Sequence, residues 1–201
     1  MTGPDLDHER AMHARTGEWP LGVDEVGRGP LAGPVLAAAV RLDPDRVPPG
    51  LGDSKALKAA RRVALDLLIR SEALALGLGA ASAGEVDALN VHRASLLAMS
   101  RAVRAAGGGA VLVDGRFVPP DLSGLAIVRG DAASASIAAA SIVAKVARDR
   151  LMAALSQHHP HYGWERNAGY GTAEHRAALL QHGVTPHHRK TFGPVRNMLC
   201  P

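Results

Sequence analysis

The chain has 201 residues, of which 47% are hydrophobic and 21% are charged. This length is typical of one globular domain, and the composition excludes an intrinsically disordered chain. The single cysteine, Cys200, excludes an intramolecular disulfide and a cysteine-rich zinc site. No signal-peptide pattern opens the sequence, and the apolar run of residues 35–40 is too short to cross a bilayer. We therefore expect a cytoplasmic protein without membrane contact.

Positive charge is concentrated towards the C-terminus. Residues 145–201 contain 8 Lys and Arg against 3 Asp and Glu, together with 7 of the 10 histidines. The whole-chain net charge of +4 therefore comes from this last quarter. A basic patch beside a neutral body is typical of a protein that binds a polyanion. A solvated basic tail without a partner gives the same count, so charge alone does not decide between them.

The chain opens with a leader and two strands. Residues 1–18 are polar and permit a helix, which predicts a leader that frays from the fold. Residues 21–23 and 35–40 are apolar and predict two strands, separated by a glycine- and proline-rich turn at residues 27–30.

A helix is predicted next, over residues 55–72. Asp53 and Ser54 precede it and are candidate N-caps. Apolar side chains recur at helical spacing, with Lys and Arg opposite, so one face should point inward. That face contains Leu57, Ala60, Ala64, Leu67 and Leu68.

Strands and helices alternate through the rest of the chain. This order indicates an α/β fold, with a small mixed sheet and helices on both of its faces. The elements expected are strands at residues 74–81, 110–113 and 125–128, and helices at residues 84–106, 133–155 and 173–181.

Four acids lie at or near the ends of predicted strands: Asp24, Glu25, Asp114 and Asp131. Carboxylates at such positions are costly unless they are paired, hydrogen-bonded or bound to a cation. If the strands are neighbours, the acids converge at one edge of the sheet, where a divalent cation would relieve their repulsion. An all-oxygen donor set favours Mg²⁺ or Mn²⁺, which can activate water and clamp a phosphodiester.

Each of these acids also has a structural interpretation that the sequence leaves open. Asp131 could cap a helix, and Asp114 could belong to a turn. On a regular strand Asp24 and Glu25 point to opposite faces, so both reach one ion only at a strand end or a bulge.

Acids elsewhere are expected to have simpler roles. Asp149 lies one helical turn after Lys145 and should pair with it. Four acids in predicted loops and helices should be solvated: Asp43, Asp45, Asp53 and Asp66.

The glycine-rich turn supports a competing hypothesis. Residues 27–32 fit the G-x-G-x-x-A pattern of dinucleotide-binding loops. That pattern requires a helix N-terminus facing a pyrophosphate, whereas Asp24 and Glu25 would repel an anion and residues 35–40 favour a strand. If the partner is instead a polyanion, backbone amides and Arg28 would contact a sugar hydroxyl and a phosphate.

Several motifs resemble those of bacterial ribonuclease HII, the type 2 ribonuclease H. They occur in the same order from about residue 20 to residue 195. The matching segments are GVDEVGRGPLAGPV (22–35), DSK (53–55), VDG (113–115), GD (130–131), SIAAASIVAKV (136–146), YGW (162–164), AGYGT (168–172) and TPHHR (185–189).

The resemblance implies an RNase H-like fold with a small helical C-terminal extension. Residues 19–156 would form the catalytic core, and the basic residues 157–201 would contribute to substrate binding. The implied activity is hydrolysis of the RNA strand of RNA–DNA hybrids and nicking 5′ of single ribonucleotides in duplex DNA, as in ribonucleotide excision repair. The products would be 5′-phosphate and 3′-hydroxyl ends, and we expect the enzyme to be a monomer.

The resemblance also assigns residues to roles. The acidic catalytic and metal site, for Mg²⁺ or Mn²⁺, corresponds to Asp24, Glu25, Asp114 and Asp131. Gly27, Arg28 and Gly29 match the loop that senses the 2′-hydroxyl, which is the group that distinguishes RNA from DNA. Tyr170 matches the tyrosine that packs on the sugar at the RNA–DNA junction. Lys55 is a candidate phosphate contact, although its spacing fits a surface lysine equally well.

Two further alternatives remain open. A non-catalytic nucleic-acid-binding module would keep the basic extension but would not need converging acids. The histidines of the extension could hold zinc, but their spacing favours phosphate contacts or loop packing; they are His158, His159, His161, His187 and His188.

Overall fold

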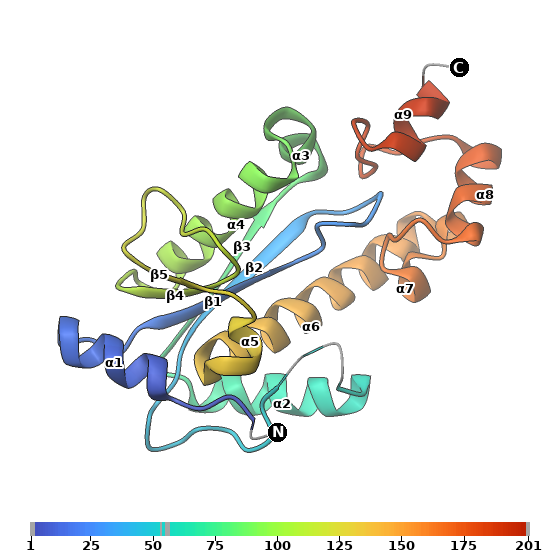
Figure 1. The fold of residues 1–201 in the computed structure, drawn as a ribbon. Coiled ribbons are helices and arrows are strands. Elements are labelled where there is room, and N and C mark those ends of the chain that lie inside the picture. Colours follow the sequence, from blue (N-terminus) through green and yellow to red (C-terminus); the bar gives the residue numbers. More distant parts are fainter. Residues whose placement is uncertain (1–2, 53, 55–56, 200–201) are drawn as a thin grey trace.

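The computed structural model describes residues 3–52, 54 and 57–199, and its centre is a five-stranded mixed sheet (Figure 1). The strand order is β3-β2-β1-β4-β5; β1 runs antiparallel to β2 and parallel to β4. The predicted α/β fold is confirmed. The strands are β1 (Leu21–Val26), β2 (Val35–Arg41), β3 (Ala75–Ala81), β4 (Val111–Asp114) and β5 (Gly124–Ile127).

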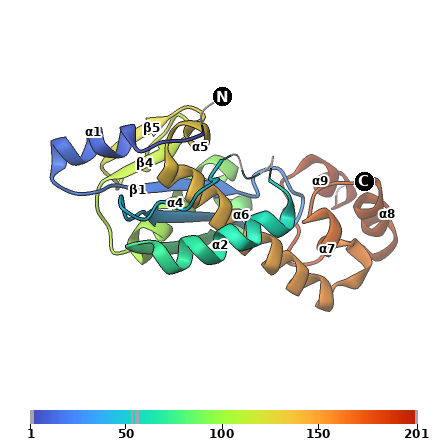
Figure 2. The same cartoon turned by 90° about the horizontal axis from the view of Figure 1, so that it is seen from below.

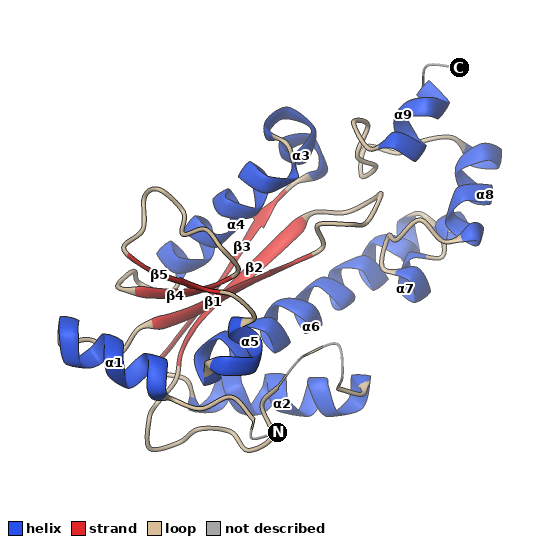
Figure 3. Ribbon diagram, in the orientation of Figure 1, coloured by secondary structure: helices blue, strands red, loops and turns tan. Residues whose placement is uncertain are grey.

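Helices cover both faces of the sheet, as Figure 3 shows. They are α1 (Asp7–Thr16), α2 (Ala59–Glu72), α3 (Ala83–Leu89), α4 (Val91–Ala105), α5 (Gly130–Ala133), α6 (Ala135–His158), the 3-10 turn η1 (Pro160–Tyr162), α7 (Trp164–Asn167), α8 (Ala173–His182) and α9 (Gly193–Leu199). Helix α4 packs on one face, and α6 packs on the other with α2 beside it (Figures 1 and 2). Among the described helices, not even the 24-residue α6 has the continuous apolar length that a bilayer crossing requires.

The apolar run of β2 is explained by burial on both faces. Ala37 and Ala39 pack on the α4 side, whereas Ala38 and Val40 pack on the α6 side. A strand covered by helices on both faces is apolar throughout rather than alternating. Strand β2 is therefore covered on both faces.

Helix α6 packs directly on the backbone of β1. A Cβ atom added to Gly22 would lie 2.1 Å from the carbonyl carbon of Ser136, so only glycine fits there. This contact sets the distance between β1, which carries Asp24, and α6.

Helix α2 begins later than predicted and buries a different face. It starts at Ala59, and no side chain provides an N-cap hydrogen bond, because the N-cap residue is Lys58. Leu65 and Ile69 point inward, whereas Leu67, expected inside, is 60% exposed. The predicted N-cap Ser54 is wrong, because its hydroxyl bonds to Ser141 instead. The other candidate, Asp53, lies outside the described residues.

Asp66 explains why the predicted face was wrong. Its carboxylate is fully buried, not solvated as expected, and pairs with Arg70 at 2.9 Å and with Arg150 of α6 at 3.3 Å. The two arginines compensate the buried charge, and the pair with Arg150 joins α2 to α6.

Residues 1–18 were expected to fray, but α1 is anchored to the core. Met12 is buried, and the buried carboxylate of Glu9 accepts hydrogen bonds from the hydroxyl of Ser134 (2.7 Å) and the N–H of Ser136 (2.8 Å). Ser134 is the N-cap of α6, and Ser136 lies in its first turn, where N–H groups need acceptors. Helix α1 thus fixes the start of α6.

Two predicted helices are interrupted. Residues 84–106 are split at Asn90, whose positive φ of 68° ends α3 and whose side chain caps α4. The helix predicted at residues 133–155 is preceded by the short α5, and α6 itself runs three residues further, to His158.

The C-terminal part, from η1 to α9, packs at one end of the sheet beside the loop between β1 and β2 (Figures 1 and 2). Its own apolar core includes Tyr162, Trp164 and Leu179 and also takes in Leu31 and Ala32 of that loop. The proposed division into a core of residues 19–156 and an extension of residues 157–201 stays a prediction.

Candidate active site

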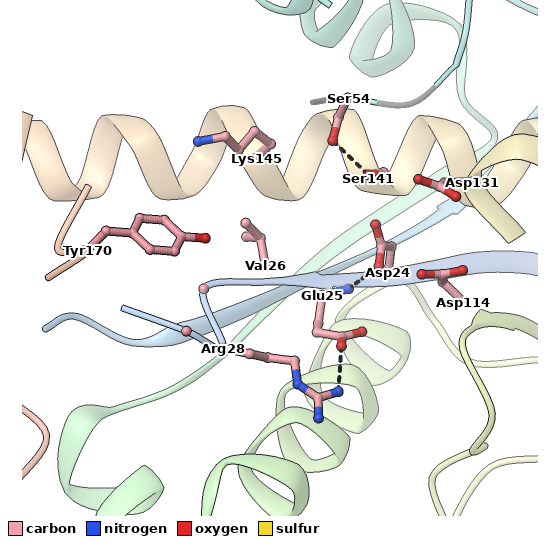
Figure 4. A pocket seen from close by; sticks show the side chains of 12 residues that line it. Asp24, Glu25, Val26, Arg28, Ser54, Asp114, Asp131, Ser141, Lys145 and Tyr170 are labelled. Atoms are coloured by element: carbon pink, nitrogen blue, oxygen red, sulfur yellow. Dashed lines mark hydrogen bonds and ion pairs between the residues drawn. The ribbon is translucent and has the colours of Figure 1, made fainter. Parts of the chain in front are cut away.

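The end of β1 opens into a pocket that gathers most of the predicted site residues (Figure 4). Val23 pairs with Val113 in the parallel β1–β4 ladder, so Asp24 and Asp114 follow at the same edge of the sheet. Helices α5 and α6 pass over this edge. The pocket is lined by Asp24, Glu25, Val26, Gly27, Arg28, Gly29, Ser54, Asp114, Asp131, Ser141, Lys145 and Tyr170.

Asp24 is the buried centre of the site and is 8% exposed. Burial raises the pKa of Asp24 well above its usual range, and the negative charges of Glu25 and Asp114 raise it further. Hydrogen bonds from the hydroxyl of Ser141 and the N–H of Glu25 oppose this shift only in part. A carboxylate in this position favours a nearby cation.

Asp114 and Asp131 complete one side of the pocket. The carboxylate of Asp114 accepts a hydrogen bond from the N–H of Gly130 at 2.7 Å, which ties the end of β4 to the start of α5. Asp131 is the next residue and lies in α5, not at its N-cap, which is Arg129. Figure 4 shows Asp24, Asp114 and Asp131 gathered between β1 and α6.

Glu25 points away from these three acids. It follows Asp24 on the regular strand β1, so its side chain leaves the opposite face, where it pairs with Arg28 at 2.9 Å (Figure 4). In this arrangement no three Asp, Glu, His or Cys side chains of the described residues form a group that could hold a metal ion.

The donor set nevertheless fits a hard divalent cation. It consists of carboxylate oxygens. Burial, followed by repulsion from Glu25 and Asp114, raises the pKa of Asp24, and a cation would offset both effects. Glu25 borders the same pocket but is paired with Arg28. The histidines of the extension form no such group with other described residues.

The side of the pocket opposite the acids is formed by Tyr170 and the glycine loop, which we define as residues 27–33 between β1 and β2. The ring of Tyr170, 48% exposed, lies beside Gly29, where an added Cβ would be 3.5 Å from its Cε1 atom. The loop leads into strand β2 and not into a helix, so the N-terminal dipole that a dinucleotide-binding loop needs is missing. The dinucleotide hypothesis is wrong for this loop.

Three polar residues of the pocket, Ser54, Ser141 and Lys145, were not predicted as site residues. Ser54 donates to Ser141 at 2.9 Å, and Ser141 in turn donates to Asp24. Lys145 lies one turn after Ser141 on α6 and pairs with Asp149 at 2.5 Å, as its spacing predicted. The spacing of Ser141 and Lys145 on one helical face was the available signal. The predicted contact Lys55 lies outside the described residues.

A chain of hydrogen bonds in the extension fixes the backbone of Tyr170. The Nδ1 atom of His175 donates to the Tyr170 carbonyl at 3.0 Å, and its Nε2 accepts from the indole of Trp164 at 3.1 Å. Because that Nε2 accepts, the Nε2–H of His188 donates to it at 3.0 Å, and the Nδ1 of His188 accepts from the N–H of Thr185 at 2.9 Å. Both rings are therefore neutral.

This chain of hydrogen bonds predicts that acid lowers the stability of the fold. Burial lowers the pKa of His188 to about 4 and also lowers that of His175, whereas an unfolded histidine titrates near 6.5. The contribution of a neutral buried histidine to the free energy of unfolding is complete above pH 6.5. It decreases towards pH 4, by up to about 1.4 kcal/mol per pH unit for one histidine.

The test is to measure the free energy of unfolding with denaturant between pH 7 and 4.5. H188N should make this free energy depend less steeply on pH, because asparagine keeps the hydrogen-bond acceptor but does not titrate. The control is H158N, at an exposed histidine; equal slopes in H188N and the unmodified protein would contradict the assignment.

Comparison with known proteins gives a consistent result. Residues 21–195 match the family model described as Ribonuclease HII. A ribonuclease HII from Ruegeria pomeroyi is 55% identical over 203 residues, which cover 99% of this chain and 86% of the relative. The RNase HII of Archaeoglobus fulgidus, solved in complex with PCNA, has a TM-score of 0.73 at 25% identity and covers 86% of this chain and 94% of that one. Bst-RNase HIII in complex with Mn²⁺, 17% identical with a TM-score of 0.69, shares the fold over 94% of this chain and 72% of that one.

Proposed function

Since the chain belongs to the ribonuclease HII family and is an endoribonuclease, we propose that it cuts the RNA strand of RNA–DNA hybrids and nicks duplex DNA 5′ of single embedded ribonucleotides. The products are 5′-phosphate and 3′-hydroxyl ends, and the nick starts ribonucleotide excision repair. The observation that carries this proposal is the pocket shared by the strand-end acids, the glycine loop and Tyr170.

The acids serve as the catalytic metal site. The metal-holding residues are Asp24, Glu25, Asp114 and Asp131, which offer only oxygen donors. Bound Mg²⁺ or Mn²⁺ supplies a Lewis acid that activates water and stabilises charge on the phosphate. Ser141 holds the carboxylate of Asp24 in place through its hydroxyl, and Ser54 holds Ser141.

The opposite wall recognises the ribonucleotide. Backbone groups of Gly27, Arg28 and Gly29 contact the 2′-hydroxyl, and glycine permits this approach because it has no Cβ. The ring of Tyr170 packs on the sugar at the RNA–DNA junction. Lys145 and Lys55 contact phosphates beside the cut.

The extension adds affinity for the duplex. Arg176, Lys190 and Arg196 are exposed on residues 157–201 and can neutralise phosphates along the substrate. One monomer carries both the acids and the extension, so it needs no second copy to complete the pocket.

The test is cleavage of an end-labelled DNA duplex that contains one ribonucleotide, with Mg²⁺ or Mn²⁺ present. We expect one product, which ends in a 3′-hydroxyl directly 5′ of the ribonucleotide, while the all-DNA duplex of the same sequence stays intact. A uniform RNA–DNA hybrid should be cut at several positions. An intact ribonucleotide duplex, or equal cutting of both duplexes, would overturn the proposed specificity.

A further inference from the structure

Arg189 of the extension is completely buried beneath the glycine loop. Its guanidinium donates from Nη2 to the carbonyl of Gly27 at 2.5 Å and from Nη1 to that of Arg28 at 2.8 Å. It also donates to the carbonyl of Gly33, from Nε at 3.0 Å and from Nη2 at 2.8 Å. One side chain thus holds three carbonyls of residues 27–33.

Arg148 of α6 supports the same loop from the side. It is 1% exposed and donates to the carbonyls of Ala32 (3.1 Å), Pro34 (3.1 Å) and Ala168 (2.8 Å). An added Cβ at Gly27 would lie 2.1 Å from its Nε atom, so the loop and the guanidinium are in direct contact.

Neither arginine forms a salt bridge with an acid in the described part of the chain. Burial lowers the pKa of Arg189 to about 10, and the charge of Arg148 contributes, but the group remains protonated at neutral pH. Burying an unpaired charge is costly, and an apolar side chain would fill the space at lower cost. What a guanidinium offers instead is five donors in a fixed plane, which can orient several carbonyls at once.

The orientation of these carbonyls determines where the neighbouring N–H groups point. In a trans peptide the C=O and N–H bonds point in opposite directions, and the described residues contain no cis peptide. Because the carbonyls of Gly27 and Arg28 point at Arg189, the N–H groups of Arg28 and Gly29 point away from it. Both residues line the pocket, and neither N–H has an acceptor among the described residues.

We propose that Arg189 is a positioning residue that turns these two peptide groups so that the N–H groups of Arg28 and Gly29 together receive one oxygen atom of the substrate. The inference rests on the proposed function. The guanidinium also polarises both peptides, which strengthens their N–H groups as donors. The oxygen belongs to the ribonucleotide, either its 2′-hydroxyl or an adjoining phosphate.

The test measures duplex binding in an Asp24→Asn background with Mg²⁺, so that cleavage does not interfere. Two duplexes are compared, identical except for one ribonucleotide, and the added change is Arg189→Lys. Lysine keeps the charge but has a single ammonium group, which cannot hold the carbonyls of Gly27, Arg28 and Gly33 in one plane. The matched control is Arg41→Lys, because Arg41 also donates to a backbone carbonyl, that of Gly108 at 3.1 Å, far from the pocket.

Loss of about tenfold in preference for the ribonucleotide duplex would support the proposal and assign the oxygen to the 2′-hydroxyl. A tenfold loss for both duplexes would support it and assign the oxygen to a phosphate. Unchanged affinity and preference in a folded Arg189→Lys protein would overturn it. If Asp24→Asn alone shows no ribonucleotide preference and the unmodified protein does not nick, the proposed function fails instead.

A second measurement does not depend on the folding of the Arg189 variant. In ¹⁵N-labelled Asp24→Asn protein, adding the ribonucleotide duplex should shift the amide protons of Arg28 and Gly29 downfield, as expected for new hydrogen bonds. If both amide signals stay in place when the duplex binds, the proposal is overturned.

Discussion

Asp24→Asn is expected to lower the rate of nicking by about 1,000-fold or more, while duplex binding stays within about threefold of the unmodified protein. Asparagine has the same shape but removes the negative charge at the buried centre of the site. The lost charge is needed to hold a cation and not to contact the duplex, so chemistry and binding should separate. Single-turnover cleavage and fluorescence anisotropy with the one-ribonucleotide duplex measure the two effects.

The fold should tolerate this change. The pKa of Asp24 is already raised by burial and by two neighbouring acids, so its charge opposes folding in the absence of a cation. The control is Asp121→Asn, at an exposed acid that pairs with Arg104. Cleavage by Asp24→Asn at the rate of this control would remove Asp24 from the proposed metal site.

Gly22→Ala should strongly destabilise the fold. The new Cβ would lie 2.1 Å from the carbonyl carbon of Ser136, and neither backbone can move without separating β1 from α6. We expect a loss of about 3 kcal/mol or more in the free energy of unfolding. Nicking should also fall, because Ser141 would move away from Asp24.

Denaturant unfolding at neutral pH provides the measurement. Gly84→Ala is the matched control: Gly84 lies in α3, and its added Cβ would meet nothing closer than the Ser82 hydroxyl at 4.0 Å. This control should unfold at the same denaturant concentration as the unmodified protein or slightly above it. An unfolding midpoint for Gly22→Ala equal to that of the control would contradict the direct packing of α6 on β1.

The sequence predicted those parts of the fold that depend on local pattern. The apolar run of residues 35–40 became β2 because helices cover both faces of that strand. Local patterns fail where charged side chains from different segments meet. Asp66 is buried because Arg70 and Arg150 compensate its charge, so α2 presents a different face to the core from the one expected. Glu9 is likewise held by residues 125 and 127 positions away, which no local pattern reveals.

The site was predictable to a similar degree. Strand-end positions were enough to expect Asp24, Asp114 and Asp131 in one place. Glu25 was expected to join them at a strand end or a bulge, but β1 is regular at this point and Glu25 leaves its opposite face. Ser54 and the buried arginines were not predictable, because their roles depend on contacts between distant segments. A buried guanidinium looks like a surface charge in a sequence. Arg148 and Arg189 were counted in the basic C-terminal quarter, although neither is exposed to a polyanion.

The contacts of Arg189 reach residues as far as 162 positions away, and this limits how the protein can be recombined. In a hybrid enzyme that takes its C-terminal segment from a distant homologue, the residues packed beneath the glycine loop would come from a different protein than the loop itself. We expect such hybrids to be active only when the glycine loop and Arg189 come from the same parent protein. Residues 27–33 and the segment that carries Arg189 should therefore be exchanged together, although they lie far apart in the sequence.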